Sequence, residues 1–263
     1  MPVAERAGQP IDYSAQGPSG APVVALLHNL LTDRTVFSAQ VARLSERFRT
    51  LAIDLRGHGG TPARRPFAVR DLVEDVLCVL DREQVQTAFL CGISLGAQVG
   101  LELALAQPAR VRGLVAMAPH PDRASARDRV MSTLGAAAVC LLGPRRLLPR
   151  AALPQLFGHT FRSQAKAEVA AWADKLAARG RLDTVRALRA WAARPALADR
   201  LARVRTRALV VVGEEDTAHP VALAERVQRA IPGARLALVA RAGHTLTLEN
   251  PHETGRLIEE FLA

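Results

Sequence analysis

The stretch that decides the fold is Thr87–Gln107, TAFLCGISLGAQVGLELALAQ. An apolar run of strand length leads into Gly-Ile-Ser-Leu-Gly at residues 92–96, and a helical pattern follows at once. A G-x-S-x-G pattern between a strand and a helix is typical of a sharp turn that exposes a serine at the C-terminal edge of a sheet. We expect a side chain at Gly92 or Gly96 to collide with a neighbouring strand or helix. Ser94 is therefore a candidate nucleophile, and a purely structural turn is the alternative.

Short apolar runs alternate with amphipathic helical patterns along most of the chain, which predicts a mostly parallel sheet with crossover helices. Several runs are apolar throughout, as expected of strands that are covered on both faces. Residues 3–16 are expected to add an antiparallel hairpin at the sheet edge. The six expected parallel strands are Val23–Leu27, Thr50–Asp54, Thr87–Gly92, Gly113–Ala118, Ala208–Gly213 and Arg235–Val239.

One long segment interrupts this alternation. Residues 120–204 contain helical patterns and no good strand, so we expect a helical cap inserted into a core of residues 1–119 and 205–263. Breaks at GPRR (143–146) and RLLPRAALP (146–154) should divide the cap into several helices, because proline and glycine interrupt helices. The apolar stretch Val130–Gly143 would either be buried against the sheet or roof a hydrophobic pocket.

The composition allows one large globular unit. The chain has 263 residues, of which 49% are apolar, and α/β folds often reach this size as one unit. The formal net charge of +10 comes almost wholly from arginine, because Lys166 and Lys175 are the only lysines. The arginines are scattered without a long basic tract, so we expect no nucleic-acid partner. Attraction of anionic substrates remains an open interpretation of the charge.

The cysteines and the apolar stretches limit the chemistry and the compartment. The three cysteines (78, 91 and 140) lie in apolar segments without C-x-x-C spacing, which favours free core residues over a disulfide or zinc site. No two histidines stand at a metal-ligand spacing with a carboxylate partner, so no metal or other cofactor is expected. The first 13 residues resemble no signal peptide, and the longest apolar stretch is shorter than the ~20 residues that span a bilayer. We therefore expect a cytoplasmic protein without a membrane partner.

A serine hydroxyl needs a base, and that base needs an acid to orient it. His244, in Arg-Ala-Gly-His, stands in a loop directly after the last expected strand. The acid should follow the preceding strand, and Glu214, Glu215 and Asp216 stand there in a row. The sequence therefore contains a candidate serine, a candidate acid and a candidate histidine, in that order along the chain.

With these motifs the chain resembles the α/β-hydrolase superfamily over essentially its whole length. The resemblance implies an α/β fold with a mostly parallel central sheet, flanking helices and an inserted helical cap. It also implies that Asp216 is the triad acid, with Glu215 and then Asp122 as alternatives. The motifs that carry it are GISLG (92–96), DLRGHG (54–59), G-x-x-D-x-x-x-P (213–220) and AGH (242–244) followed by ENP (249–251).

The loop LLHNLLTD, Leu26–Asp33, departs from the usual family pattern. Family members usually carry His-Gly here, whereas this chain has His28-Asn29. The resemblance implies that the backbone N–H groups of Leu30 and Leu95 form the oxyanion hole. Asparagine tolerates positive φ better than most residues, so we expect Asn29 to replace glycine in the turn. An asparagine at this point also resembles the β-ketoadipate enol-lactone hydrolases.

Further polar and aromatic residues are candidates for the substrate pocket. His28 is expected to pack or bond beneath the oxyanion loop, and His58 to anchor a loop. His219 and His252 are expected at surface or helix-cap positions. The candidates for substrate contact are Asn29, His120, Trp172 and Trp191, with core packing as the alternative for both tryptophans.

These features together predict a serine hydrolase that cleaves a carboxylic ester or lactone through an acyl-enzyme intermediate. Ser94 would attack the carbonyl carbon, His244 would take and return the proton, and Asp216 would hold the histidine. One alternative is that the same triad performs carbon–carbon bond hydrolysis, acyl transfer or cofactor-free perhydrolysis. Another is a ligand-binding protein of hydrolase fold with little turnover. The expected partner is a small-molecule ester or lactone, and the sequence does not specify an oligomeric state.

Overall fold

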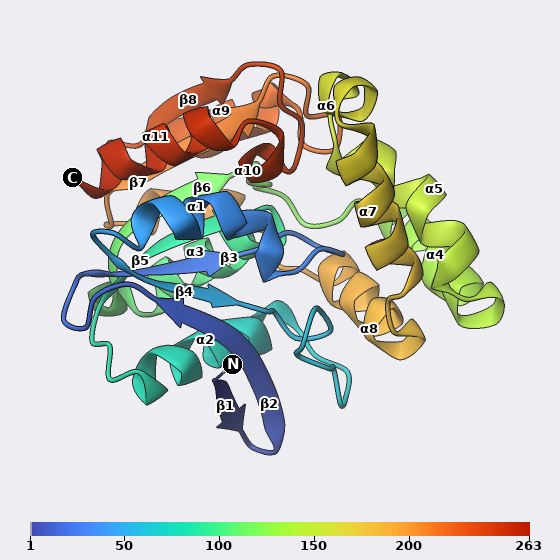
Figure 1. Cartoon of the computed structure of the whole chain (residues 1–263), viewed down its shortest axis with the longest axis horizontal. Helices are drawn as coiled ribbons and strands as arrows, with labels where there is room; N and C mark the ends of the chain where they lie inside the picture. The colour runs from blue at the N-terminus through green and yellow to red at the C-terminus, as the bar shows by residue number, and fades with distance from the viewer. Residues whose placement is uncertain (1) are drawn as a thin grey trace.

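The computed structural model describes residues 2–263, and its centre is an eight-stranded sheet in the order β1-β2-β4-β3-β5-β6-β7-β8 (Figure 1). β1 pairs antiparallel with β2 and β2 with β4, and the remaining neighbours pair in parallel. The predicted α/β sheet and edge hairpin are confirmed, with strand ends shifted by no more than two residues. The strands are β1 (Val3–Arg6), β2 (Gln9–Gln16), β3 (Val23–Leu27), β4 (Arg49–Ile53), β5 (Ala88–Ile93), β6 (Val111–Met117), β7 (Ala208–Gly213) and β8 (Arg235–Val239).

Each face of the sheet carries its own hydrophobic cluster, because successive side chains of a strand point to opposite faces. In β3, Ala25 and Leu27 join one cluster, whereas Val24 and Leu26 join the other. The first face is covered by α2 (Val69–Arg82), α3 (Leu95–Ala106) and α9 (Val221–Ala230), and the second by α1 (Ser38–Leu44) and α11 (Pro251–Leu262). Shorter turns of helix are η1 (Arg34–Phe37), η2 (Pro108–Arg110) and α10 (Leu246–Glu249).

A block of helices, here called the helical insertion (residues 126–203), lies between β6 and β7 in the sequence. Figure 1 shows it standing to one side of the sheet, beyond the ends of the central strands. This confirms an inserted helical region, while the exact division into a core and a cap at residues 120–204 stays a prediction. The insertion contains α4 (Ala126–Leu142), α5 (Pro144–Leu156), α6 (His159–Gln164), α7 (Lys166–Ala177), α8 (Arg181–Ala192) and η3 (Ala198–Arg203).

One of the two breaks predicted in this segment is present and the other is wrong. Gly143, at φ 81°, separates α4 from α5, and Pro144 begins α5. However, α5 continues through Pro149 and Pro154. Each proline removes one backbone hydrogen bond, but the residues four positions earlier, whose carbonyl groups lose a partner, are exposed. Packing of α5 on its helical neighbours therefore overrides the local preference.

Helix α4 settles how the apolar stretch Val130–Gly143 is used. Only Ala136 and Val139 of α4 are buried, and Val130, Leu134 and other large apolar side chains are exposed, so the stretch is not buried against the sheet. Its inner side instead roofs a cavity, which was the other prediction. Cys140 is exposed here, so the expected core role holds for Cys91 and fails for this cysteine. No helix among the described residues is both long and apolar enough to cross a bilayer.

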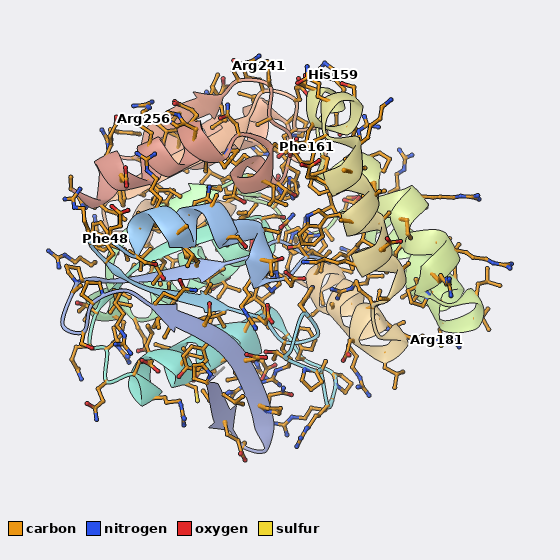
Figure 2. All side chains as sticks on the ribbon, viewed as in Figure 1. Phe48, His159, Phe161, Arg181, Arg241 and Arg256 are labelled. Atoms are coloured by element: carbon orange, nitrogen blue, oxygen red, sulfur yellow. The ribbon has the colours of Figure 1, made fainter. Side chains whose placement is uncertain are left out.

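The arginines are spread over the whole molecule. Figure 2 shows charged side chains projecting from helices, strands and loops in every direction. The labelled examples Arg181, Arg241 and Arg256 lie at the start of α8, after β8 and in α11. Many are paired with carboxylates, as Arg256 is with Glu253 at 2.6 Å. The arginine-rich composition thus corresponds to a dispersed surface charge and not to one basic stripe.

Candidate active site

Ser94 occupies the sharp turn between β5 and α3. Its φ and ψ are 50° and −104°, a conformation that costs a non-glycine residue about 1–3 kcal/mol. The flanking glycines make the turn possible: a Cβ on Gly92 would lie 2.3 Å from the carbonyl carbon of Gly96, and one on Gly96 would lie 2.0 Å from the oxygen of Leu27. The predicted collisions are confirmed. The turn therefore holds a nearly buried serine at the positive end of a helix.

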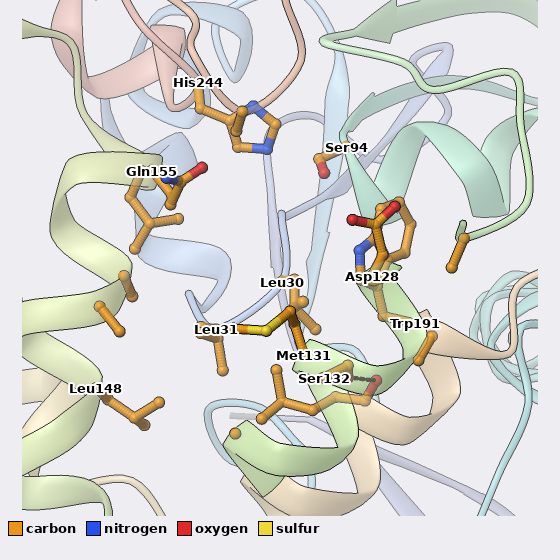
Figure 3. A pocket seen from close by; sticks show the side chains of 18 of the residues that line it. Leu30, Leu31, Ser94, Asp128, Met131, Ser132, Leu148, Gln155, Trp191 and His244 are labelled. Carbon is orange, nitrogen blue, oxygen red and sulfur yellow. Dashed lines mark hydrogen bonds between the residues drawn. The ribbon is translucent and has the colours of Figure 1, made fainter. Parts of the chain in front are cut away.

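His244 and Asp216 form a buried pair beside this turn. Nδ1 of His244, in the loop after β8, donates to Oδ2 of Asp216 at 2.8 Å. The other carboxylate oxygen accepts from the N–H groups of Ala218 and His219 at 2.9 and 2.8 Å, which fixes its orientation. With Nδ1 carrying the proton, Nε2 is left as the basic atom of the ring. Figure 3 shows the His244 ring and the Ser94 hydroxyl facing the same end of a cavity.

The two alternative acids have other partners. Glu215 accepts a hydrogen bond from the backbone N–H of Thr160 at 2.9 Å, in the helical insertion. Asp122 accepts both guanidinium N–H groups of Arg226 at 2.7 and 2.9 Å. Of the three carboxylates, the one that the structure places against the candidate histidine is Asp216.

Glu249 is a functional candidate that the sequence reasoning used only as part of a motif. Its two carboxylate oxygens accept the N–H groups of Gly158, Gly243 and Thr245 at 2.7, 2.8 and 3.0 Å. Burial raises the pKa of Glu249 to about 7, although the three backbone donors act in the opposite direction. The side chain thus holds both neighbours of His244 and ties this loop to the insertion. The sequence feature that could have identified Glu249 is its position just before Asn-Pro at the start of α11.

The loop after β3 has the expected place beside Ser94, but its turn differs from the expected one. The positive φ of 68° belongs to Leu31, and Asn29 is not among the residues with positive φ, so its predicted glycine-like role is wrong. The N–H of Thr32 bonds to the carbonyl of Asn29 at 3.3 Å, and the residue third in such a turn takes the positive φ in type II geometry. Leu30 is the second residue of this turn, so its N–H group takes no part in the turn's own hydrogen bond.

Asn29 itself is a buried structural residue. Its amide nitrogen donates to Thr245 Oγ1 at 3.1 Å, and its amide oxygen accepts from Thr32 Oγ1 at 2.7 Å. It does not line the cavity that contains Ser94. Its side chain thus joins the oxyanion loop to the loop that carries His244. Leu95, the other expected donor, is the first residue of α3, where backbone N–H groups lack an acceptor within the helix.

His28 bonds to the oxyanion loop, as predicted, and His58 bonds within the loop after β4, in agreement with its predicted role as a loop anchor. Nδ1 of His28 donates to the carbonyl of Asn29 at 2.8 Å, and its Nε2 accepts the N–H of Leu55 at 3.0 Å. His58 bonds through Nδ1 to the carbonyl of Arg56 at 3.1 Å. Burial lowers the pKa of both imidazoles, so both are neutral. Their role is to hold the loops rather than to take part in chemistry.

A cavity of about 560 Å³ opens between this edge of the sheet and the helical insertion. Its walls are mainly apolar side chains of α4, α5 and α8 (Figure 3). His120 and Trp191, two of the four substrate-contact candidates, line it, whereas Trp172 packs on Phe157 with ring centroids 6.4 Å apart and lies outside it. The polar residues in the lining are Ser94, His120, Asp128, Ser132, Gln155, Arg194, His219 and His244.

His219 was expected at the surface or at a helix cap, and this expectation is wrong. Its side chain is buried and its ring meets that of His244 edge-on, with centroids 4.7 Å apart. Nδ1 donates to the carbonyl of Ala118 at 2.7 Å, and burial holds its pKa well below the usual value. Trp191 stacks on its other side at 6.0 Å. The loop that carries Asp216 folds back over the sheet edge, which local sequence alone does not reveal.

Comparison with known proteins identifies the family in which this arrangement occurs. A family model described as "Alpha/beta hydrolase family" matches residues 21–257. The chain belongs to the α/β hydrolase family. The resemblance stated from the motifs is thereby confirmed, and the fold and inserted helices of this α/β hydrolase agree with it.

Three relatives illustrate the range of proteins to which this α/β hydrolase is similar. The pimeloyl-[acyl-carrier protein] methyl ester esterase of Nitrosomonas europaea is 30% identical over 251 residues, 92% of this chain and 95% of that protein. The 3-oxoadipate enol-lactonase 1 of Acinetobacter baylyi is 34% identical over 108 residues, so the chain matches only 41% of that enzyme's length. The crystal structure of the enol-lactonase from Burkholderia xenovorans LB400 superposes with a TM-score of 0.92 at 26% identity, covering 99% of both chains.

Across residues 2–263, no three histidine, cysteine, aspartate or glutamate side chains are arranged to hold a metal ion.

Proposed function

We propose that this α/β hydrolase cleaves a carboxylic ester or lactone through an acyl-enzyme on Ser94. The observation that carries the proposal is that a strained, nearly buried serine and an aspartate-paired histidine open into one cavity. A serine in an ordinary structural turn needs neither the strain nor the histidine. The cavity walls are mostly apolar, which suits an organic acyl or alkyl group.

In the proposed reaction, the same residues act first in forming the acyl-enzyme and again in its hydrolysis. His244 Nε2 takes the proton of the Ser94 hydroxyl as its oxygen attacks the carbonyl carbon, and Asp216 stabilises the imidazolium without taking the proton. The N–H groups of Leu30 and Leu95 bind the oxyanion, and losing one such donor typically costs about 100- to 1,000-fold in turnover. His244 then protonates the leaving alcohol. Water, deprotonated by the same imidazole, cleaves the acyl-enzyme to release the acid.

The relatives support this assignment at the level of reaction class. One is named a methyl ester esterase and two are named enol-lactonases. Esters and lactones share the acyl–oxygen bond that the proposed mechanism breaks. No relative's own substrate is carried over to this chain, because the identities are modest and the helical insertion supplies most of the cavity wall.

The decisive experiment is intact-mass labelling with a fluorophosphonate. The wild type should gain one adduct and Ser94→Ala none, because only an activated serine hydroxyl attacks the phosphorus. Ser132→Ala is the matched control: Ser132 lines the same cavity, but its hydroxyl donates to the carbonyl of Leu188 at 3.1 Å. This control should label like the wild type. A folded wild type that takes no label would contradict the proposal and favour a ligand-binding protein with little turnover.

Product analysis then separates reactions that share the triad. Esters and lactones should yield an acid and an alcohol or a hydroxy acid. Vinylogous diketones would be cleaved only if the enzyme hydrolyses carbon–carbon bonds, and added alcohol or peroxide would divert the acyl group only if transfer or perhydrolysis competes with water. Turnover of diketones without turnover of any ester or lactone would reject the proposed substrate class.

A further inference from the structure

Arg194 is the one cationic side chain in the lining of the cavity. It lies just after α8, and only 5% of the residue is exposed. Its guanidinium carbon stands 3.9 Å from the centre of the Trp191 ring, so the planar group is stacked on an aromatic wall. This contact holds the guanidinium in place within the cavity lining.

The guanidinium of Arg194 is poorly satisfied by the protein. Nη1 donates to the carbonyl of Trp191 at 3.2 Å, but the buried Nε has no hydrogen-bond partner. Burial lowers its pKa to about 10, which still leaves it charged at neutral pH. Within residues 2–263, no carboxylate forms an ion pair with it. A buried charge without a partner is costly, so its retention points to a ligand that supplies one.

The nearest acidic residues are already engaged. Asp122 and Asp128 act on Arg194 only through space. Both oxygens of Asp122 accept from Arg226, and Asp128 accepts from the N–H and the hydroxyl of Ser125 at 3.1 and 2.7 Å. Neither carboxylate therefore accepts a hydrogen bond from Arg194, which lies in the cavity lining.

Arg56 is a fully buried arginine that the protein pairs with a carboxylate of its own. Arg56 is 1% exposed, and Asp75 accepts from its Nε and Nη2 at 2.9 and 2.6 Å. The protein thus supplies a bidentate carboxylate to an arginine in its core. Arg194 has no such carboxylate, and its one hydrogen-bond acceptor among the described residues is the carbonyl of Trp191.

We infer that Arg194 binds a carboxylate of the substrate, so that the preferred esters or lactones are acids that carry this group away from the scissile bond. The inference rests on the proposed function and names its substrate class. Arg194 lies on Trp191, Trp191 stacks on His219, and His219 meets His244. Two aromatic rings thus separate the anion site from the catalytic histidine, which leaves space for a carbon chain between the carboxylate and the carbonyl.

The first test compares matched substrates. Monomethyl esters of linear dicarboxylic acids are measured against methyl esters of alkanoic acids of the same chain length. The wild type should favour the acidic ester by about 10- to 100-fold in kcat/KM, mainly through KM, as expected for a hydrogen-bonded charge. Arg194→Met should abolish this ratio, and Arg194→Lys should retain part of it. The readout is the ratio of the kcat/KM values of the two substrates, because loss of packing on Trp191 affects both substrates alike.

Arg189→Met is the matched control. Arg189 is an exposed residue of α8, the helix that ends just before Arg194, and it does not line the cavity, so this variant changes the net charge equally. It should keep the wild-type preference. If it loses the preference as Arg194→Met does, the effect is general electrostatic steering and the inference is overturned. Preference of the wild type for neutral esters, or for cationic esters through Asp128, would also overturn it.

A binding measurement decides the inference even without turnover. Trp172→Phe leaves Trp191, directly under the guanidinium, as the only tryptophan. Adipate should give a saturable change in its fluorescence, at least about 10-fold weaker in affinity when Arg194→Met is added, and neutral hexanediol should give none. Binding of inorganic phosphate more tightly than adipate would reject the carboxylate assignment. Fluorophosphonate labelling without any acid preference would refute this inference alone, whereas absence of labelling would refute the proposed function alone.

Discussion

At the scale of single residues, the site depends on which of several neighbouring acids reaches the histidine. Asp216 and Glu215 are adjacent in the chain, yet one contacts His244 and the other contacts the helical insertion. The two side chains therefore reach different segments from neighbouring positions of the loop after β7. A substitution at each position therefore tests a separate role.

Asp216→Asn should lower kcat by about 10,000-fold, because an amide in this position no longer selects the proton-bearing Nδ1 tautomer of His244. Steady-state kinetics on the best ester found by screening would measure the loss. Glu215→Gln is the matched control and should retain turnover, since Glu215 bonds to Thr160 and His159 instead. An equal loss in both variants would mean that the loop as a whole, and not the Asp216 carboxylate, is required.

At the scale of elements, the helical insertion is held to the sheet edge by a partly buried arginine at its bend. Arg179, between α7 and α8, donates to the carbonyl groups of Leu31 and Gly57 at 3.2 and 2.7 Å. These two carbonyls belong to the loops after β3 and β4. The insertion and the oxyanion loop are therefore joined by one side chain.

Arg179→Met should destabilise the protein by about 1–3 kcal/mol, because it leaves two inward-facing carbonyl groups without their donor. Thermal denaturation would measure the loss, and limited proteolysis should show earlier cleavage within residues 126–203. Lys175→Met is the matched control: Lys175 pairs with Asp33 at 3.2 Å at the surface, where such pairs contribute about 0–1 kcal/mol. Equal effects of the two substitutions would argue against Arg179 as the specific link.

At the scale of the whole molecule, four histidines with a lowered pKa make stability depend on pH. Burial holds the pKa of His28, His58 and His219 below the ordinary value, and that of His120 at about 4. The unfolded chain binds protons on all four near pH 6.5 and the folded chain does not, so stability falls as the pH drops below about 6.5. Glu249 has the opposite effect. Its pKa is raised to about 7, so its contribution to stability is present at low pH and is lost as the pH rises through 7.

The melting temperature should therefore decline steadily between pH 6.5 and pH 4, as measured by circular dichroism. His58→Asn should give a shallower decline, because one buried site no longer takes up a proton on unfolding. His252→Gln, at an exposed position of α11, should leave the slope unchanged. A slope that is identical in all three proteins would show that His58 is not held neutral by burial.

The sequence by itself determined the order of the elements and the candidates for the chemistry-bearing residues. Strand and helix periodicity, the glycines around Ser94 and the positions of Asp216 and His244 after successive strands are local patterns. Because the carboxyl ends of parallel strands share one edge of a sheet, these patterns also predicted which residues would meet. The main departures were Asn29, whose turn places positive φ at Leu31, and the prolines tolerated inside α5.

Only the tertiary structure decided what surrounds these residues. The burial of His219 against His244, the three N–H groups on Glu249 and the missing carboxylate at Arg194 all depend on segments far apart in the chain. The structure also selected Asp216 over its neighbour as the partner of His244. The physical reason is that burial and hydrogen-bond partners are properties of packed segments, whereas periodicity and turn chemistry are properties of neighbouring residues.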